Sequence, residues 1–193
     1  MLDRPIVCKF GGTSLADAGR FAQVRDIVKS DSRRRYIVVS APGKRHPEDI
    51  KITDRLISAY ANGEPERESA LDGARAVFRA IAAELGLRPY DHELDSLTRA
   101  AETSRDLSAS RGEWLCAKML AEYIGLPFAD AAELFVFHDG ALDERETYAR
   151  IRSLPRQGAV VPGFYGADAL GEVVTFPRGG SDISGAHVAA ALN

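Results

Sequence analysis

Short apolar runs and a helical pattern alternate along the first forty residues. Residues 6–10 form an apolar run interrupted by Lys9, and residues 36–40 form a second run rich in β-branched side chains. Between these runs, apolar residues recur at helical spacing, at Phe21, Val24, Ile27 and Val28. Strand, helix and strand in this order predict parallel strands joined by a right-handed crossover. The chain therefore begins as an α/β sheet.

The middle of the chain is predicted to be helical. Residues 41–52 are polar and contain Pro42, Gly43 and Pro47, which is typical of a loop. Four segments with helical periodicity follow, at residues 53–60, 66–85, 91–109 and 111–124.

Strand patterns return in the last third of the chain, at residues 127–129, 134–137, 159–162 and 173–176. Residues 143–154 and 182–192 have helical patterns, and the turn at 168–171 resembles a hairpin connection between the last two strands. We expect an α/β fold with three layers, in which helices flank an open, mainly parallel sheet. The sequence shows neither an internal repeat nor a linker, so one unit is expected.

Composition narrows the class of partner. The 193 residues are 45% hydrophobic and 27% charged, as in an ordinary globular protein with one sizeable core. A net charge of −3 favours neither nucleic acid nor an anionic membrane surface, so small molecules are the expected ligands. Cys8, Cys116 and the four histidines lack the spacing of a metal site, and we assign them no catalytic role.

The N-terminus reaches a strand pattern within the first residues and lacks a basic region followed by a signal-type apolar stretch. No apolar run in the sequence is long enough to span a bilayer. We therefore expect a cytoplasmic protein.

Two glycine pairs stand where a ligand could bind. Lys9 ends the first predicted strand and precedes Gly11 and Gly12, at the sheet edge where open α/β folds bind ligands. The spacing matches neither a Walker A loop nor a dinucleotide fingerprint. The alternative is an exposed lysine before an ordinary glycine turn.

The second glycine pair lies in the segment Pro-Arg-Gly-Gly-Ser-Asp at 177–182, which offers backbone amides and a fixed cation to an anionic ligand. Alternatively, Gly179 and Gly180 only turn the chain, Ser181 caps the last helix, and Arg178 and Asp182 are solvated.

Three further segments have both a functional and a structural interpretation. Thr53 is a candidate ligand residue or a helix N-cap. Ser110 and Glu113 are spaced as in a capping box, in which the glutamate returns to the serine amide. Phe164, after Gly163, is a candidate site residue or part of the core.

These segments together resemble the aspartate kinases of the amino acid kinase family. Lys-Phe-Gly-Gly-Thr-Ser at 9–14 resembles the opening family motif, and four further segments resemble later motifs in family order: 38–45 with 51–54, 110–113, 163–164 and 177–182. Pro162 and Pro177 depart from the pattern, since many relatives have a polar residue and a glycine there.

The resemblance implies transfer of the ATP γ-phosphoryl group to the side-chain carboxylate of L-aspartate. The products would be ADP and 4-phospho-L-aspartate, in the first step toward lysine, threonine and methionine, with Mg²⁺ accompanying ATP. It further implies that residues 1–193 are the amino-terminal, aspartate-binding part of an amino acid kinase domain. The nucleotide-binding half and the ACT regulatory domains would be absent.

The same resemblance implies roles for individual residues. Lys9 and Asp182 would be catalytic, with Asp182 orienting Lys9 or the substrate. Glu113 would bind the aspartate ammonium and Arg178 an aspartate carboxylate. The other implied substrate-binding residues are Ser40, Thr53, Phe164, Gly179 and Ser181. The implied phosphate-binding residues are Lys9, Gly11, Gly12, Ser14 and Gly180.

Because most of the ATP site would lie outside this chain, we expect no normal kinase turnover from it alone. A strand edge exposed by the missing half would favour homo-oligomers or association with that half. Two alternatives remain open: a kinase of this family acting on another carboxylate substrate, and a non-catalytic amino-acid-binding subunit or half of a split kinase.

Overall fold

The computed structural model describes residues 4–177 and 179–192. Within this part of the chain, three parallel strands form a central sheet in the order β1-β2-β5: β1 (Ile6–Phe10), β2 (Arg34–Val39) and β5 (Ala159–Pro162). The crossover from β1 to β2 passes through α1 (Ala18–Lys29), as the apolar pattern predicts. The bounds of β1 and β5 agree with the prediction.

The remaining described strands form a second sheet in the order β4-β3-β6-β7: β4 (Ala141–Leu142), β3 (Val136–His138), β6 (Tyr165–Asp168) and β7 (Val173–Thr175). The pair β3–β6 is parallel, whereas β3–β4 and β6–β7 are antiparallel. The α/β class with mainly parallel strands is confirmed. The strands divide between two sheets, and the chain passes from the first to the second at Phe164, which lies between β5 and β6 and has a φ of 79°.

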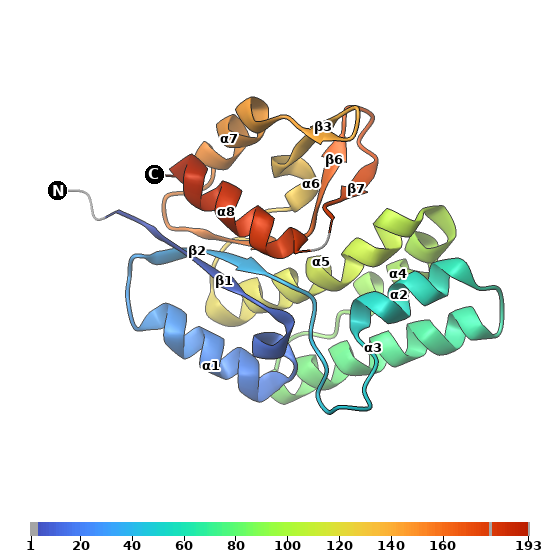
Figure 1. The fold of residues 1–193 in the computed structure, drawn as a ribbon. Coiled ribbons are helices and arrows are strands. Elements are labelled where there is room, and N and C mark those ends of the chain that lie inside the picture. The colour runs from blue at the N-terminus through green and yellow to red at the C-terminus, as the bar shows by residue number, and fades with distance from the viewer. Residues whose placement is uncertain (1–3, 178, 193) are drawn as a thin grey trace.

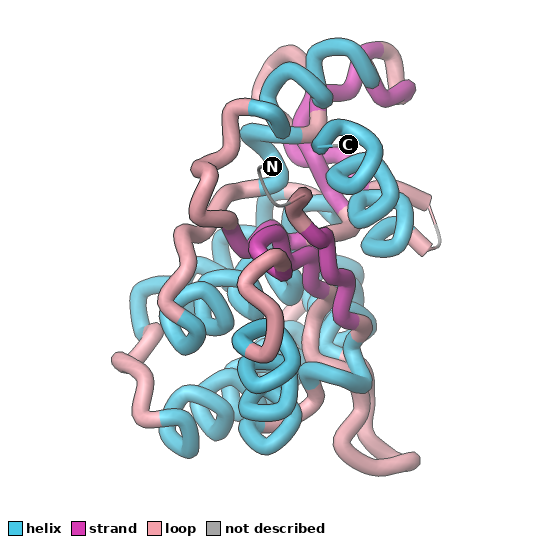
Figure 2. The backbone as a smooth tube through the Cα atoms, turned by 90° about the vertical axis from the view of Figure 1, so that its left-hand side faces the viewer, coloured by secondary structure: helices cyan, strands magenta, loops and turns pink. Residues whose placement is uncertain are grey.

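Helices cover both faces of the central sheet (Figures 1 and 2). Below it and to its right in Figure 1 lie α1 and four further helices: α2 (Ile52–Ala61), α3 (Glu66–Leu85), α4 (Asp91–Thr103) and α5 (Arg105–Ile124). Above it lie the second sheet and three helices: α6 (Ala131–Leu134), α7 (Glu144–Arg152) and α8 (Gly180–Leu192). A 3₁₀ turn, η1 (Gly12–Leu15), follows β1.

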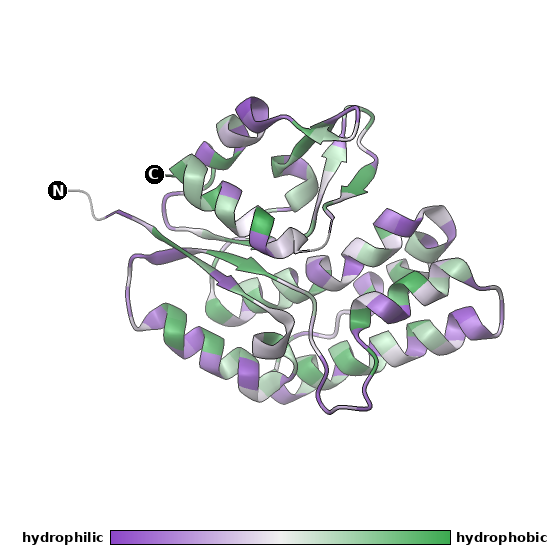
Figure 3. Cartoon of the chain, viewed as in Figure 1, coloured by the Kyte–Doolittle hydropathy of each residue, from purple (hydrophilic) through white to green (hydrophobic). Residues whose placement is uncertain are grey.

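The core consists of two apolar clusters that meet at the central sheet. Ile37 and Val39 of β2 pack into the lower cluster, with side chains of α1 to α5. Tyr36 and Val38 pack into the upper cluster, with side chains of α6 to α8. Successive side chains of a strand point to opposite faces, so one strand contributes to both clusters. The helices are amphipathic as well: in Figure 3, hydrophilic and hydrophobic residues alternate along α1 and α3.

Several predicted boundaries are wrong. The predicted break near residue 110 lies instead at Ser104, whose Oγ accepts a hydrogen bond from the Leu107 amide at 3.1 Å. Ser110 therefore lies inside α5, and its Oγ donates to the Leu107 carbonyl at 2.8 Å. The capping-box interpretation of Ser110 and Glu113 is wrong because Glu113 is not in the first turn of a helix.

Other corrections follow from long-range pairing. Residues 127–129 contribute only an isolated bridge between Phe128 and Val160. A strand was predicted at residues 134–137. In the structure, α6 ends at Leu134 and β3 begins only at Val136. The turn at 168–171 joins β6 to β7, and β6 was not predicted, because Tyr-Gly-Ala-Asp has a weak strand pattern.

The polar loop before α2 is folded around one buried carboxylate. Asp49 is 5% exposed and accepts hydrogen bonds from Arg45 Nε at 2.7 Å and from the Ile50 amide at 2.9 Å. The Arg45 bond, assisted by charge, holds the pKa of Asp49 well below its usual value. The loop ends at Lys51, which is the N-cap residue of α2. Thr53 lies inside the helix, so its interpretation as an N-cap is wrong.

Candidate functional site

A cavity of about 340 Å³ opens at the carboxyl ends of β1 and β2, beside the start of α8. It is lined by residues from six segments that are separated in the sequence: Lys9, Ser40, Lys51, Thr53, Asp54, Glu113, Phe164, Gly179, Gly180, Ser181 and Asp182. This is the edge where parallel sheets bind ligands, because the strands end there and the following loops surround a common space.

Lys9 and Asp182 form an ion pair at this edge. Lys9 Nζ lies 2.8 Å from Asp182 Oδ1, and the two side chains are 24% and 73% exposed. A Cβ built at Gly185 would lie only 3.3 Å from Lys9 Cβ, so the absence of a side chain there lets α8 pack closely against the lysine. Because the pair is solvated, it contributes little to stability, and its effect is to fix the lysine ammonium beside the cavity.

Glu113 is the buried charged group of the site. It is 5% exposed, and among the described residues its Oε2 has no hydrogen-bond partner. Burial raises the pKa of Glu113 to about 7, against the opposing effects of the Ala41 amide, which donates to the carboxylate, and of nearby Lys9. A proton or a ligand ammonium group would complete the environment of this carboxylate.

A second cavity, of about 410 Å³, adjoins the first and is also lined by Glu113. It shares four lining residues with the first: Ser40, Lys51, Thr53 and Glu113. Its outer edge is formed by two loops in close contact, in which the Gly43 amide donates to the Gly12 carbonyl at 2.8 Å. A Cβ at Gly43 would lie 2.6 Å from the Gly12 carbonyl carbon, so this approach requires glycine.

The Gly163–Phe164 turn forms another side of the first cavity. Phe164 has a left-handed backbone with a φ of 79°, which is uncommon for a bulky residue. Its amide donates to Ser184 Oγ at 3.1 Å, and its carbonyl accepts from the Phe176 amide at 2.7 Å. A Cβ at Gly180 would lie 2.9 Å from Phe164 Cδ2, so the ring and the first turn of α8 are in tight contact.

The structure brings most of the predicted site residues together. Nine of them line the first cavity: Lys9, Ser40, Thr53, Glu113, Phe164, Gly179, Gly180, Ser181 and Asp182. Gly12 lines the second cavity, and a Cβ at Gly11 would lie 3.6 Å from Lys9 Nζ. Ser14 is exposed on η1 and does not line either cavity. Arg178 lies outside the described residues.

Sequence reasoning missed Lys51, which lines both cavities and forms no ion pair with the described residues. It also missed Thr13 and Lys44, which line the second cavity, and Asp54, which lines the first. Lys51 and Asp54 belong, with Thr53, to the segment 51–54 that resembles a family motif, so the sequence did point to this region. Which of these neighbours reaches the cavity depends on where α2 begins, and the loop around Asp49 determines that.

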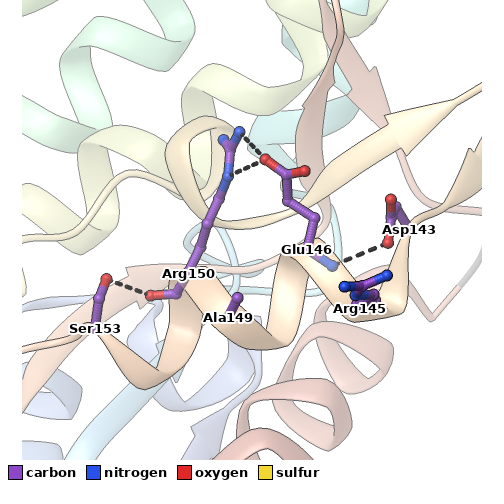
Figure 4. A pocket seen from close by; sticks show the side chains of 6 residues that line it. All are labelled: Asp143, Arg145, Glu146, Ala149, Arg150 and Ser153. Atoms are coloured by element: carbon purple, nitrogen blue, oxygen red, sulfur yellow. Dashed lines mark hydrogen bonds and ion pairs between the residues drawn. The ribbon is translucent and has the colours of Figure 1, made fainter.

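Another cavity, of about 580 Å³, lies apart from this site along α7 (Figure 4). Its polar groups bond mainly to one another: Asp143 accepts from the Glu146 amide at 2.9 Å, and Arg150 Nη2 lies 2.6 Å from Glu146 Oε1. Arg150 also donates to the Glu133 carbonyl. Unlike the cavity beside Glu113, it contains no buried carboxylate oxygen without a partner.

No group of three or more histidine, cysteine, aspartate or glutamate side chains is arranged to hold a metal ion in the part of the chain that the structure describes. Among the same residues, no helix has the length and apolar character needed to cross a membrane.

The chain is similar to several aspartate kinases over nearly its whole length. The chain is 36% identical to aspartokinase 3 of Bacillus subtilis over 209 residues, covering 96% of this chain and 46% of that protein. It superposes on a crystal structure of Clostridium acetobutylicum aspartate kinase with a TM-score of 0.94 and 39% identity, over 99% of this chain and 46% of the other. A structure of Escherichia coli aspartokinase III in complex with aspartate and ADP gives a TM-score of 0.85 and 30% identity, over 97% and 47%.

The chain thus spans a little under half the length of the relatives that it matches. The sequence profile of the amino acid kinase family matches residues 4–193, which is nearly all of the chain. The chain therefore belongs to the amino acid kinase family.

Proposed function

We propose that this chain forms the aspartate-binding part of an aspartate kinase. The reaction would transfer the ATP γ-phosphoryl group to the side-chain carboxylate of L-aspartate and release 4-phospho-L-aspartate and ADP. The observation that carries the proposal is the buried Glu113 carboxylate. One of its oxygens has no partner in the part of the chain that the structure describes, and the cavity beside it also contains a lysine ammonium. Similarity to aspartokinases over nearly the whole chain supports the same substrate.

Glu113 would bind the ammonium group of aspartate. Two charges in a poorly solvated site attract strongly, and a charge-assisted hydrogen bond is about twice as strong as a neutral one. Binding the ammonium would lower the pKa of Glu113 from about 7, because the charged form gains a partner. Thr53, Ser40 and Ser181 would supply further hydrogen bonds from the cavity lining.

A cation is also needed for the carboxylates of aspartate. The family resemblance assigns this role to Arg178, which lies outside the described residues. Within the cavity, Lys51 is a second candidate because its charge has no ion-pair partner among the described residues. The cavity would therefore offer aspartate an anion, Glu113, for its ammonium group and a cation, Lys51, for a carboxylate.

Lys9 would face the phosphoryl group during transfer. The migrating group carries negative charge, and a fixed cation with glycine-loop amides stabilises it without any covalent step on the protein. Asp182 would orient Lys9, as the distance of 2.8 Å between them supports. A general base has little to do here, since the attacking carboxylate is already ionised at neutral pH.

ATP would enter as the co-substrate together with Mg²⁺. In such sites the ion usually contacts the phosphates, water and one or two carboxylates rather than a dedicated protein cage. Asp182 is an exposed carboxylate at the cavity and fits that limited role. Most of the ATP site would lie in a nucleotide-binding half outside these residues, and the cytoplasm, where both substrates are abundant, is the proposed location.

Calorimetric titration of the chain with L-aspartate and with succinate tests the ammonium site. Succinate has both carboxylates but no amino group, so we expect L-aspartate to bind at least about tenfold more tightly. Glu113→Gln should remove that preference by weakening L-aspartate binding, and succinate binding should change little. Glu84→Gln, on the exposed surface of α3, is the control.

An unchanged preference for L-aspartate over succinate in Glu113→Gln would contradict the assignment. L-glutamate and N-acetyl-L-glutamate belong in the same titration series, because tighter binding of either would favour another kinase of the family. Aspartate binding without any nucleotide binding would favour an amino-acid-binding subunit or one half of a split kinase.

A further inference from the structure

We propose that Ser184 is a positioning residue for the aspartate cavity, an inference that rests on the proposed function. Ser184 does not line either cavity and is fully buried in the second turn of α8. Its hydroxyl joins two sides of the site, because Oγ accepts the Phe164 amide at 3.1 Å and donates to the Gly180 carbonyl at 2.9 Å.

The first of these bonds acts on a strained backbone. Phe164 has a φ of 79°, a conformation that costs about 1 kcal/mol or more for a residue with a side chain. Surrounding contacts must therefore hold it in place. Ser184 Oγ satisfies the Phe164 amide, and the Phe176 amide donates to the Phe164 carbonyl at 2.7 Å, so both backbone groups of the strained residue are bonded.

The second bond acts on the first turn of α8. Gly180, Ser181 and Asp182 all line the cavity, and Asp182 orients Lys9. The Gly180 backbone faces the Phe164 ring without a side chain between them, and a Cβ at Gly163 would lie 2.8 Å from Ser181 Cα. Any shift of the Phe164 turn would therefore move the groups that face the substrate.

A single hydroxyl thus sets the spacing between the Phe164 turn and the start of α8. Removal of the hydroxyl would leave the Phe164 amide without its partner and would free the turn to relax away from φ 79°. The Phe164 ring would then shift relative to Gly180 and Ser181. We infer that Ser184 acts on substrate affinity through these neighbours and not by contact with the substrate.

The test compares Ser184→Ala, Ser184→Cys and Ser184→Thr in the 193-residue chain. Threonine keeps the hydroxyl, and cysteine keeps the size with a much weaker acceptor. The matched control is Ser108→Ala in α5: Ser108 is also fully buried, and its Oγ donates to the Leu56 carbonyl at 2.7 Å, but it does not line the cavity. Both alanine variants thus lose a buried hydrogen bond between elements.

Two measurements are made on each variant: the Kd for L-aspartate by calorimetry, and the exchange rate of the Phe164 amide in protein labelled with ¹⁵N-phenylalanine. We expect Ser184→Ala and Ser184→Cys to weaken aspartate binding about tenfold and to speed Phe164 exchange. Ser184→Thr should restore both, and Ser108→Ala should lower the melting temperature without changing either.

Equal loss of melting temperature in the two alanine variants, with an unchanged Kd in Ser184→Ala, would overturn the proposal. If Ser184→Ala does not fold, the comparison of the cysteine and threonine variants decides the question in the same way. Failure of the wild-type chain to bind L-aspartate would count against the proposed function alone. In that case Phe164 exchange still tests whether Ser184 holds the turn, and unchanged exchange in Ser184→Cys would refute it.

Discussion

Glu113 is a buried carboxylate whose ionised form opposes folding. Its carboxylate is buried, one of its oxygens has no partner among the described residues, and its pKa is raised to about 7. In the unfolded chain the same group would ionise at its usual pKa of 4.5. The folded, empty site therefore favours the protonated form, and a ligand cation reverses that preference.

This difference predicts a pH-dependent effect of Glu113→Gln on stability. Because the folded-state pKa is raised, the stabilising effect of protonated Glu113 is complete below pH 4.5 and is lost as the pH rises through about 7. Glutamine does not titrate. The unfolding free energy of the variant should therefore rise relative to that of the wild type as the pH increases, by up to about 3 kcal/mol above pH 8.

Urea unfolding of both proteins between pH 5.5 and 8.5 should show about 2 kcal/mol of this gain, because the remainder develops below pH 5.5. Groups other than Glu113 titrate in both proteins, so their contributions cancel in the difference. A difference in unfolding free energy that does not vary with pH would show that Glu113 keeps an ordinary pKa in the folded chain.

At the scale of elements, the site depends on how closely helices approach loops. A Cβ at Gly112 of α5 would lie 2.8 Å from Ala41 Cβ and 3.1 Å from Ile52 Cγ2. The Ala41 amide donates to Glu113, the next residue of the helix. Gly112 therefore permits a contact between α5 and the loop after β2 that a larger residue would prevent.

We expect Gly112→Ala to destabilise the chain by about 1–3 kcal/mol, although alanine has the higher helix propensity. The added methyl group should push the Ala41 loop away from Glu113 and weaken L-aspartate binding as well. Gly19→Ala in α1 is the matched control, because Gly19 is helical and exposed and should be neutral or slightly stabilising on substitution.

Thermal unfolding and calorimetry with L-aspartate measure the two effects. A stable Gly112→Ala variant with unchanged affinity would mean that the loop adjusts without moving the Ala41 amide.

At the scale of the whole molecule, two apolar clusters share one strand. Val38 and Val39 are neighbours in β2 and are both fully buried, yet Val38 belongs to the upper cluster and Val39 to the lower. Trp114 of α5 packs against both clusters. The cavity lies where the helices below the sheet and those above it meet, so its geometry depends on both clusters.

This sharing predicts that the chain unfolds in one cooperative transition. Val38→Ala and Val39→Ala should each lower the unfolding free energy by about 1–3 kcal/mol, because each removes buried methyl groups. Native-state hydrogen exchange should lose protection in α3 and in α8 alike for either variant. Loss confined to one side of the sheet, or two separate unfolding transitions, would contradict this view.

Much of the local structure could be predicted from the sequence. The bounds of β1, α3 and β5 agree with the predicted ranges because their apolar periodicity is strong and is bounded by turn residues. The segments that carry the candidate site residues were also recognised, since glycine pairs and adjacent charges are visible without a structure.

Tertiary structure alone decided the rest, for physical reasons. The missed strand β6 and the division into two sheets depend on pairing between residues that are distant in sequence, which local propensity does not encode. The break at Ser104, by contrast, has a local cause, the N-cap bond from the Leu107 amide to Ser104 Oγ. The burial of Glu113 and the bonds of Ser184 are properties of the surrounding residues. The sequence by itself determined which chemical groups are available, whereas packing decided which of them are desolvated, aligned and left without a partner.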